Sequence, residues 1–230
     1  MSGDPVLLVT GASAGIGEAC ARLASERGYR VVLAARRTET IERIAGELGG
    51  PGRAIAVPTD VGVWEDNAAV VARALEAFGR VDVAVANAGF GVVPGWLEDT
   101  PERWQAMVQT NVLGTAFTMR AAIPAVTEAR GHLVIMGSVG GKRVRPGSLY
   151  SCTKWATNAM GEAIRQDLHG TGVRVTVVSP GTVDTEFFFD TQRPAALEAA
   201  DVARAVLYAV EQPGHVDVNE VVVRPVGQPT

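Results

Sequence analysis

The chain has 230 residues, of which 47% are hydrophobic and 20% charged, and its formal net charge is -4. This composition predicts one globular domain over residues 1–230. The basic residues are scattered singly or in pairs, which argues against nucleic acid or an anionic membrane as a partner. With no basic leader and no apolar run of roughly 20 residues, a cytoplasmic protein is expected. Because Cys20 and Cys152 stand in unrelated contexts and the three histidines are far apart, neither a disulfide nor a metal site is expected.

Seven short, β-branched runs alternate with longer helical patterns. The runs lie at residues 6–9, 31–33, 54–57, 81–85, 133–136, 173–178 and 220–223. Several are apolar almost throughout, as strands covered on both faces must be, and each gap has room for a crossover helix. A cap at Thr100 followed by Pro101 predicts a helix start after the fourth run. We therefore predict an α/β fold, a Rossmann-like doubly wound seven-stranded parallel sheet with helices on both faces in a single domain.

A glycine-rich turn, Thr10-Gly11-Ala12-Ser13-Ala14-Gly15-Ile16-Gly17, follows the first strand and opens a helix. Its three glycines permit a tight turn, close approach of the backbone to a pyrophosphate and close packing of the helix on the sheet. The helix N-terminus adds unpaired N–H groups and positive potential, and Ser13 adds a hydroxyl donor. The spacing is one residue wider than the usual dinucleotide fingerprint, so a purely structural turn stays open as an alternative.

The second strand ends in Ala34-Ala35-Arg36-Arg37, at the point where an acid would bind the adenosine 2′-hydroxyl of NAD. No acid is present there. Two guanidinium groups instead suit a 2′-phosphate, because their planar donors match its geometry. We predict that the cofactor is NADP(H), with an exposed basic helix start as the alternative.

A second motif, Tyr150-Ser151-Cys152-Thr153-Lys154, places a phenol and an ammonium four residues apart, on one face of a predicted helix. A phenol is a poor base at neutral pH, and a nearby cation such as Lys154 favours its ionised form. Ser138 ends the fifth strand, from where its hydroxyl is expected to polarise the same substrate oxygen. Cys152 is expected to be a half-buried helix residue without chemistry.

Together these motifs resemble the short-chain dehydrogenase/reductase family, in its compact single-domain subclass, over nearly the whole chain. The resemblance rests on Thr10–Gly17, Asp60, Asn87-Ala88-Gly89, Asn111, Ser138, Tyr150, Lys154 and Pro180-Gly181. It implies an oxidoreductase that moves a hydride between nicotinamide and a carbonyl or secondary alcohol, with Tyr150 as general acid/base. With the arginines after the second strand, the predicted activity is NADP-dependent. It also implies a homodimer or homotetramer, and the small residues Ala156, Ala159 and Ala163 suit close packing between helices.

The resemblance assigns roles to individual positions. The catalytic residues are expected to be Asn111, Ser138, Tyr150 and Lys154, with Asn111 kinking its helix and holding a relay water through its carbonyl. The residues expected to bind cofactor are Gly11, Ser13, Gly15, Ile16, Gly17, Arg36, Arg37, Asp60, Val61, Asn87, Gly89, Tyr150, Lys154, Pro180, Gly181, Val183 and Thr185. Ala14 stands where NADP users often carry a basic residue, so the cofactor prediction depends on Arg36 and Arg37.

The substrate is not specified by these motifs. A lid is expected near residues 184–200, and Lys142, Arg143 and Arg145 face either an anionic substrate or solvent. The C-terminus is similar to the NADP-dependent 3-hydroxy acid and serine dehydrogenases. Small 3-hydroxy acids, 3-oxoacyl thioesters and secondary-metabolite aldehydes or ketones are therefore the candidate substrate classes. A catalytically silent NADP-binding sensor is the alternative function, disfavoured because the four catalytic residues are present, and a sugar-nucleotide epimerase would need a longer chain.

Overall fold

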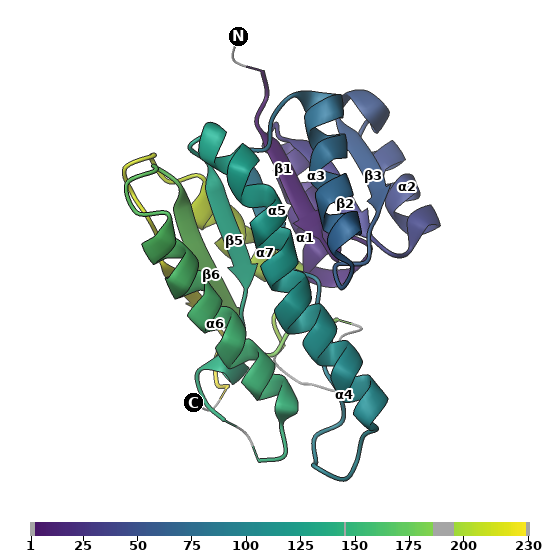
Figure 1. Ribbon diagram of the computed structural model, residues 1–230, viewed down its shortest axis with the longest axis vertical. Coiled ribbons are helices and arrows are strands. Elements are labelled where there is room, and N and C mark those ends of the chain that lie inside the picture. The colour runs from purple at the N-terminus through teal and green to yellow at the C-terminus, as the bar shows by residue number, and fades with distance from the viewer. Residues whose placement is uncertain (1–2, 145, 186–195, 229–230) are drawn as a thin grey trace.

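The computed structural model describes residues 3–144, 146–185 and 196–228. Its strands form one seven-stranded sheet, parallel throughout, in the order β3-β2-β1-β4-β5-β6-β7 (Figure 1). The strands are β1 (Val6–Thr10), β2 (Arg30–Ala35), β3 (Ala54–Pro58), β4 (Val83–Ala86), β5 (His132–Met136), β6 (Arg174–Pro180) and β7 (Glu220–Val223). Each predicted run overlaps one of them, and the predicted doubly wound parallel sheet is confirmed.

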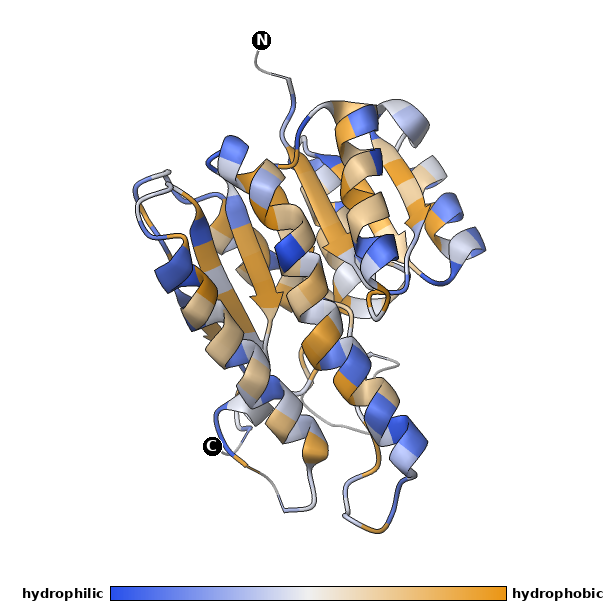
Figure 2. Ribbon diagram, viewed as in Figure 1, coloured by the Kyte–Doolittle hydropathy of each residue, from blue (hydrophilic) through white to orange (hydrophobic). Residues whose placement is uncertain are grey.

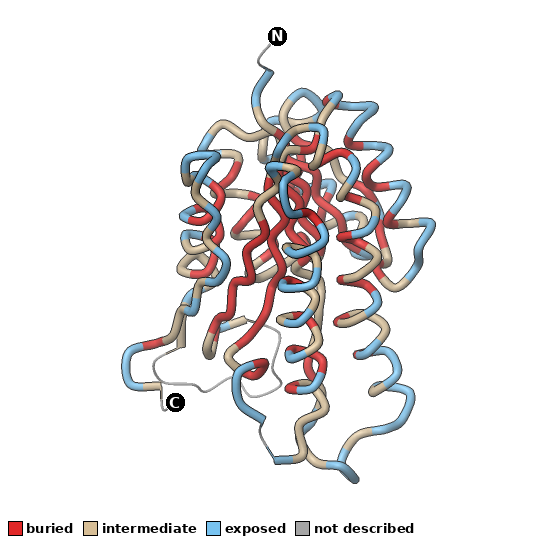
Figure 3. Tube along the Cα trace, turned by 60° about the vertical axis from the view of Figure 1, so that its left-hand side comes forward, coloured by how far each residue is buried: buried red, intermediate tan, exposed pale blue. Residues whose placement is uncertain are grey.

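Helices cover both faces of the sheet (Figure 1). One face carries α1 (Gly15–Glu26), α2 (Thr38–Glu47) and α7 (Ala199–Val210), and the other carries α3 (Trp64–Phe78), α5 (Thr115–Glu128) and α6 (Leu149–Asp167). Successive strand side chains point to opposite faces, so Leu7 and Val9 pack toward α1 while Val6 and Leu8 pack toward α3 and α5. The central strands are accordingly apolar (Figure 2) and buried (Figure 3), whereas the edge strands β3 and β7 are only partly buried. In the described part of the chain, no helix has both the length and the apolar character needed to span a membrane.

The helix expected after the fourth strand begins where the cap predicts. α4 (Pro101–Val108) starts directly after Thr100, whose hydroxyl accepts a hydrogen bond from the Arg103 N–H at 3.3 Å. It continues into η2 (Gln109–Gly114), a π-helical turn that contains Asn111, and then into α5. Single π turns interrupt regular helices and concentrate at functional sites. The expected irregularity at Asn111 is therefore a wider helical turn.

The strand order places a switch point between β1 and β4. From β1 the chain adds β2 and β3 on one side, then returns to add β4 on the other. The loops that leave the carboxyl ends of β1 and β4 therefore diverge, and open α/β sheets bind ligands in the crevice that this creates.

A buried histidine lies at the opposite, amino end of β5. His132 is fully buried, and its Nε2 lies 2.7 Å from the Thr176 hydroxyl, which itself donates to the Val218 carbonyl at 2.5 Å. A hydroxyl has one proton, so Nε2 must donate to Thr176, and Nδ1 has no hydrogen-bond partner within the described residues. Burial, with a smaller contribution from the charge of Arg174, lowers the pKa of His132 to about 3.

This environment predicts a loss of stability in acid. Between pH 6.5 and pH 3 the unfolded chain binds one more proton at His132 than the folded chain. The free energy of unfolding therefore falls by about 1.4 kcal/mol for each unit by which the pH is lowered in this range. His132→Gln keeps a donor for Thr176 but does not titrate. Urea unfolding at pH 7 and pH 5 should show wild type losing about 2 kcal/mol more than the variant. Equal losses in the two proteins would contradict the assignment.

Candidate active site

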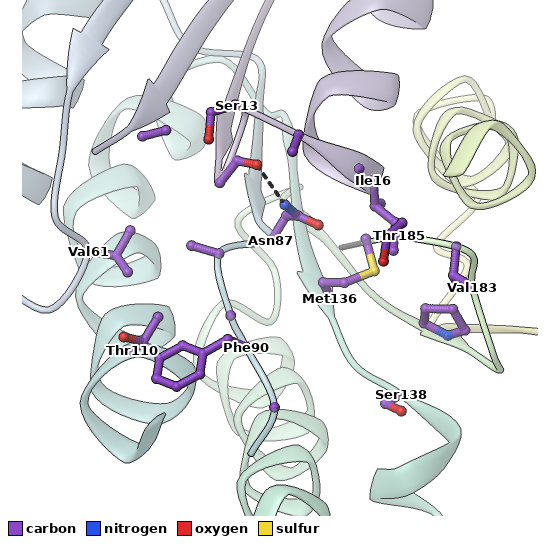
Figure 4. A pocket seen from close by; sticks show the side chains of 18 of the residues that line it. Ser13, Ile16, Val61, Asn87, Phe90, Thr110, Met136, Ser138, Val183 and Thr185 are labelled. Atoms are coloured by element: carbon purple, nitrogen blue, oxygen red, sulfur yellow. Dashed lines mark hydrogen bonds between the residues drawn. The ribbon is translucent and has the colours of Figure 1, made fainter. Parts of the chain in front are cut away.

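A cavity of about 480 Å³ opens along the carboxyl edge of the sheet. Its walls are short segments that leave β1 to β6, together with parts of α4, η2 and α6 (Figure 4). They include residues 11, 13–16, 35–37, 59–61, 87–91, 136–138, 180–181, 183 and 185. Residues far apart in sequence converge here because every parallel strand ends at the same edge.

The glycine turn after β1 has the backbone geometry of an anion cradle. Gly11 and Gly15 have positive φ angles of 67° and 56°, which side-chain-bearing residues rarely adopt. A Cβ at Gly17 would lie 2.3 Å from the Gly11 carbonyl oxygen, so only glycine allows α1 to start this close to the turn. Ala14, at the N-cap of α1, offers no side-chain acceptor, which leaves the first N–H groups of the helix for a ligand.

The turn is fixed against the loop after β4. The Thr10 hydroxyl accepts hydrogen bonds from the N–H groups of Asn87 and Ala88 at 3.1 and 3.2 Å. The Asn87 side chain also donates to the Thr10 carbonyl at 2.9 Å. Asn87 thus holds the glycine turn from within the cavity wall (Figure 4).

Two arginines stand at one end of the cavity, immediately after β2. Arg36 and Arg37 are exposed and line it, and Arg37 Nε donates to the Ser13 hydroxyl at 3.0 Å. Asp60 and Val61 follow β3 beside them, and the Asp60 carboxylate accepts from the Gly62 N–H at 2.9 Å. A phosphate at this end would meet guanidinium groups.

Ser138, Tyr150 and Lys154 all line the same cavity. The Ser138 hydroxyl accepts from the Gly140 N–H at 3.0 Å, which leaves its own proton for a second acceptor. A Cβ at Gly140 would lie 3.3 Å from the Ser138 hydroxyl and 3.4 Å from the Tyr150 ring, so the two side chains flank this glycine. The Lys154 ammonium lies 5.9 Å from the centre of the Tyr150 ring. The four-residue spacing therefore brings phenol and ammonium together.

Lys154 is the buried cation of the site. Its side chain is 5% exposed, and its Nζ donates to the Met136 carbonyl at 2.7 Å. Burial lowers the pKa of Lys154 to about 8. The ammonium is therefore mostly protonated at neutral pH, and it is close enough to titration for a neighbouring charge to change its state.

Two of the predicted site residues, Asn111 and Gly17, do not line the cavity. Gly17 acts through helix packing, as described above. Asn111 is buried behind the wall, where its side chain bonds Phe90 and Thr153 and its carbonyl accepts from the Thr115 hydroxyl at 2.8 Å. Any effect of its side chain on the cavity is transmitted by these neighbours.

Sequence reasoning missed several lining residues, namely Ala14, Ala35, Thr59, Ala88, Phe90, Gly91, Arg103, Thr110, Met136 and Gly137. Most adjoin a predicted segment, so extending each motif by one or two residues would have found them. Thr110 precedes the predicted Asn111 and reaches the cavity from η2 (Figure 4). Arg103 carried no such signal, because it reaches the cavity only through the path of α4.

Other predictions concern the surroundings. Lys142 pairs with Glu220 at 2.5 Å, and neither Lys142 nor Arg143 lines the cavity. Arg145 and most of the expected lid, residues 186–195, lie outside the described residues, although Val183 and Leu197 on either side of that segment pair with each other. Cys152, expected to be half-buried, is exposed because its helix face turns away from the sheet.

The sequence matches the family described as short chain dehydrogenase over residues 5–195. An uncharacterized oxidoreductase of Staphylococcus aureus is 40% identical over 228 residues, covering 97% of this chain and 98% of the relative. Among solved structures, the alcohol dehydrogenase of the archaeon Thermococcus sibiricus, complexed with 5-hydroxy-NADP, has a TM-score of 0.92 at 32% identity and covers 99% of both chains. The closed form of a serine dehydrogenase complexed with NADP+ has a TM-score of 0.92 at 32% identity, covering 98% of this chain and 96% of the other.

The matched region contains the glycine turn, the Ser138 loop and the Tyr150 helix that surround the cavity. The family match covers most of the chain, and the Staphylococcus aureus relative is similar along nearly its whole length. The sequence and fold comparisons therefore indicate the same family. This chain belongs to the short chain dehydrogenase family, and it is an oxidoreductase of that family.

Proposed function

We propose that this protein is an NADP-dependent oxidoreductase that interconverts a carbonyl compound and a secondary alcohol, with Tyr150 as general acid/base. The observation that carries the proposal is that Ser138, Tyr150 and Lys154 border the same cavity as the uncapped glycine turn. A dinucleotide with its phosphates on that turn would extend along the cavity toward these three side chains.

Each side chain has a distinct task in this proposal. When bound, the nicotinamide supplies or accepts the hydride. Tyr150 donates its phenolic proton to the carbonyl oxygen during reduction and takes it back during oxidation. Ser138 donates its free proton to the same oxygen and orients it. Lys154 favours the ionised phenol through its positive charge.

The cofactor proposal rests on charge at the adenosine end. Arg36 and Arg37 line the cavity where an acid would serve NAD, and guanidinium groups attract a 2′-phosphate. The alcohol dehydrogenase and the serine dehydrogenase above were both solved with NADP or an analogue of it. Pro180, Gly181, Val183 and Thr185 would grip the carboxamide, and Thr185 packs 3.2 Å from the position of a Cβ at Gly15.

The substrate is proposed by class. Similarity to a serine dehydrogenase and to an alcohol dehydrogenase favours small hydroxy acids and secondary alcohols. A panel of L-serine, 3-hydroxybutyrate, secondary alcohols and a 3-oxoacyl thioester, followed by NADPH absorbance, would rank these classes. We call the compound turned over fastest the reference substrate.

The proposed assembly is a homodimer or homotetramer in the cytoplasm, paired through α6. Ala159 and Ala163 are exposed on this helix, so packing within the chain does not explain them. Trp155, 47% exposed, lies on the same face. An adjacent apolar groove lined by α3, α5 and α6 includes Trp64 and Leu75, both partly exposed. Such a surface suits burial against a second copy.

Cofactor preference gives the first test. NADP(H) should bind at least tenfold more tightly than NAD(H), since Arg36 and Arg37 attract the phosphate. Arg36→Asp should weaken NADP(H) binding and leave NAD(H) binding largely unchanged. Fluorescence titration of both cofactors measures this, and equal affinities in wild type would argue against the proposal.

The proton-transfer role gives the second test. Tyr150→Phe keeps the ring but removes the proton, so turnover of the reference substrate should fall by about 10²- to 10⁴-fold with cofactor affinity nearly unchanged. Lys154→Ala should lower both turnover and cofactor affinity, because the Lys154 ammonium is expected to bind the nicotinamide ribose as well. Wild-type oxidation should rise with pH through an ionisation that the Phe variant lacks. Full activity in Tyr150→Phe would disprove the mechanism.

The assembly gives the third test. Light scattering at micromolar concentration should report twice or four times the mass of one chain. Trp155→Glu places a charge on the exposed face of α6 and should shift the population toward monomer, because the charge would be buried between copies. A wild type that is strictly monomeric would rule out the interface.

A further inference from the structure

The Asn111 side chain is buried, and both its amide oxygen and its amide nitrogen are hydrogen-bonded. Its Oδ1 accepts from the Phe90 N–H at 3.0 Å, which fixes the orientation of the amide because only the oxygen accepts. Its Nδ2 donates to the Phe90 carbonyl at 2.9 Å and to the Thr153 hydroxyl at 3.1 Å. Both amide protons are therefore committed, and neither points into the cavity.

Thr153 continues this chain of hydrogen bonds to Tyr150. Its hydroxyl accepts from Asn111 and donates its single proton to the Tyr150 backbone carbonyl at 2.7 Å. Thr153 is 2% exposed, so water does not replace these partners. A directed path thus runs from Phe90 through Asn111 and Thr153 to the peptide group of Tyr150.

The path joins two walls of the cavity at the first turn of α6, where helical hydrogen bonds are incomplete. Tyr150 is only the second residue of α6, within the turn whose N–H groups lack helical partners. Ser148 caps one of these groups by accepting from the Ser151 N–H at 3.1 Å. Thr153 links the same turn, through hydrogen bonds with Asn111, to the Phe90 segment that lines the cavity.

Thr157 shows what a threonine does in this helix without such a link. One turn after Thr153 and fully buried, it donates to the Lys154 carbonyl at 2.9 Å in the same three-residue pattern. Its hydroxyl makes no side-chain hydrogen bond in the described structure. The bond back to the helix is thus shared by both residues, and the bond to Asn111 distinguishes Thr153.

We propose that Thr153 is a positioning residue, through which Asn111 holds the first turn of α6 and keeps the Tyr150 phenol in register with Ser138 and the substrate oxygen. The inference rests on the proposed role of Tyr150 in proton transfer. It gives the Asn111 side chain a part in the reaction although that side chain lies outside the cavity. A shift of about 1 Å in a reacting group is enough to lower turnover by one to two orders of magnitude.

The test compares Thr153→Val, Thr153→Ser and Thr157→Val with the reference substrate and NADP(H). Thr153→Val should lower kcat about tenfold or more, leave the KM for NADP(H) within twofold, and move the half-maximal oxidation rate to higher pH. Thr153→Ser, which keeps the hydroxyl, should stay within about threefold of wild type. Thr157→Val should lower the melting temperature comparably to Thr153→Val and change kcat less than twofold.

Equal kcat in Thr153→Val and Thr157→Val would overturn the inference, and so would a rise in the KM for NADP(H) that accounts for the whole loss. If Thr153→Val does not fold, Thr153→Ser and Thr153→Ala, which differ only in the hydroxyl, make the same comparison. Tyr150→Phe in the same assay separates the two hypotheses. Should it be inactive while the threonine variants match each other, only the positioning role fails, whereas an active Tyr150→Phe overturns both.

Discussion

The hydrogen bonds between Thr10 and Asn87 are the interaction on which the rest of the site depends. At the switch point β1 and β4 stop pairing, so the backbone groups beyond Thr10 lose their sheet partners. Hydrogen bonds from Asn87 and Ala88 to the Thr10 side chain, and from Asn87 to the Thr10 carbonyl, replace that pairing. These bonds join the two loops at the base of the crevice and fix the glycine turn against the loop after β4.

This constraint also explains why the glycines cannot be exchanged. A Cβ at Gly11 would lie 2.9 Å from both the Ala88 Cα and the Asn87 side-chain nitrogen. A larger residue would separate the turn from the β4 loop that positions it. The same close approach brings α1 over the cavity, so one packing requirement determines both the shape of the cradle and the direction of the helix N-terminus.

Much of the architecture could be predicted from sequence, because its signals are local. Apolar runs identified all seven strands, and the Thr100 cap identified the start of α4. The Tyr150 and Lys154 pair needed only helical spacing to be placed on one face. What could not be predicted depends on contacts between distant segments. The approach of Arg103 to the cavity and the bond between Asn111 and Thr153 arise from how α4, η2 and α6 pack, and no short pattern encodes that packing.

Lys154 shows how the site conflicts with the stability of the fold. Its pKa of about 8, against 10.5 for an exposed lysine, means that a protonated Lys154 at neutral pH costs the folded state about 3 kcal/mol relative to the unfolded chain. The bond to the Met136 carbonyl offsets only part of the lost hydration. An apolar residue would fill this volume without that cost. Retaining a buried cation beside Tyr150 is thus understandable if the charge acts on the phenol, and a cofactor that binds only the folded state would restore the lost stability by mass action.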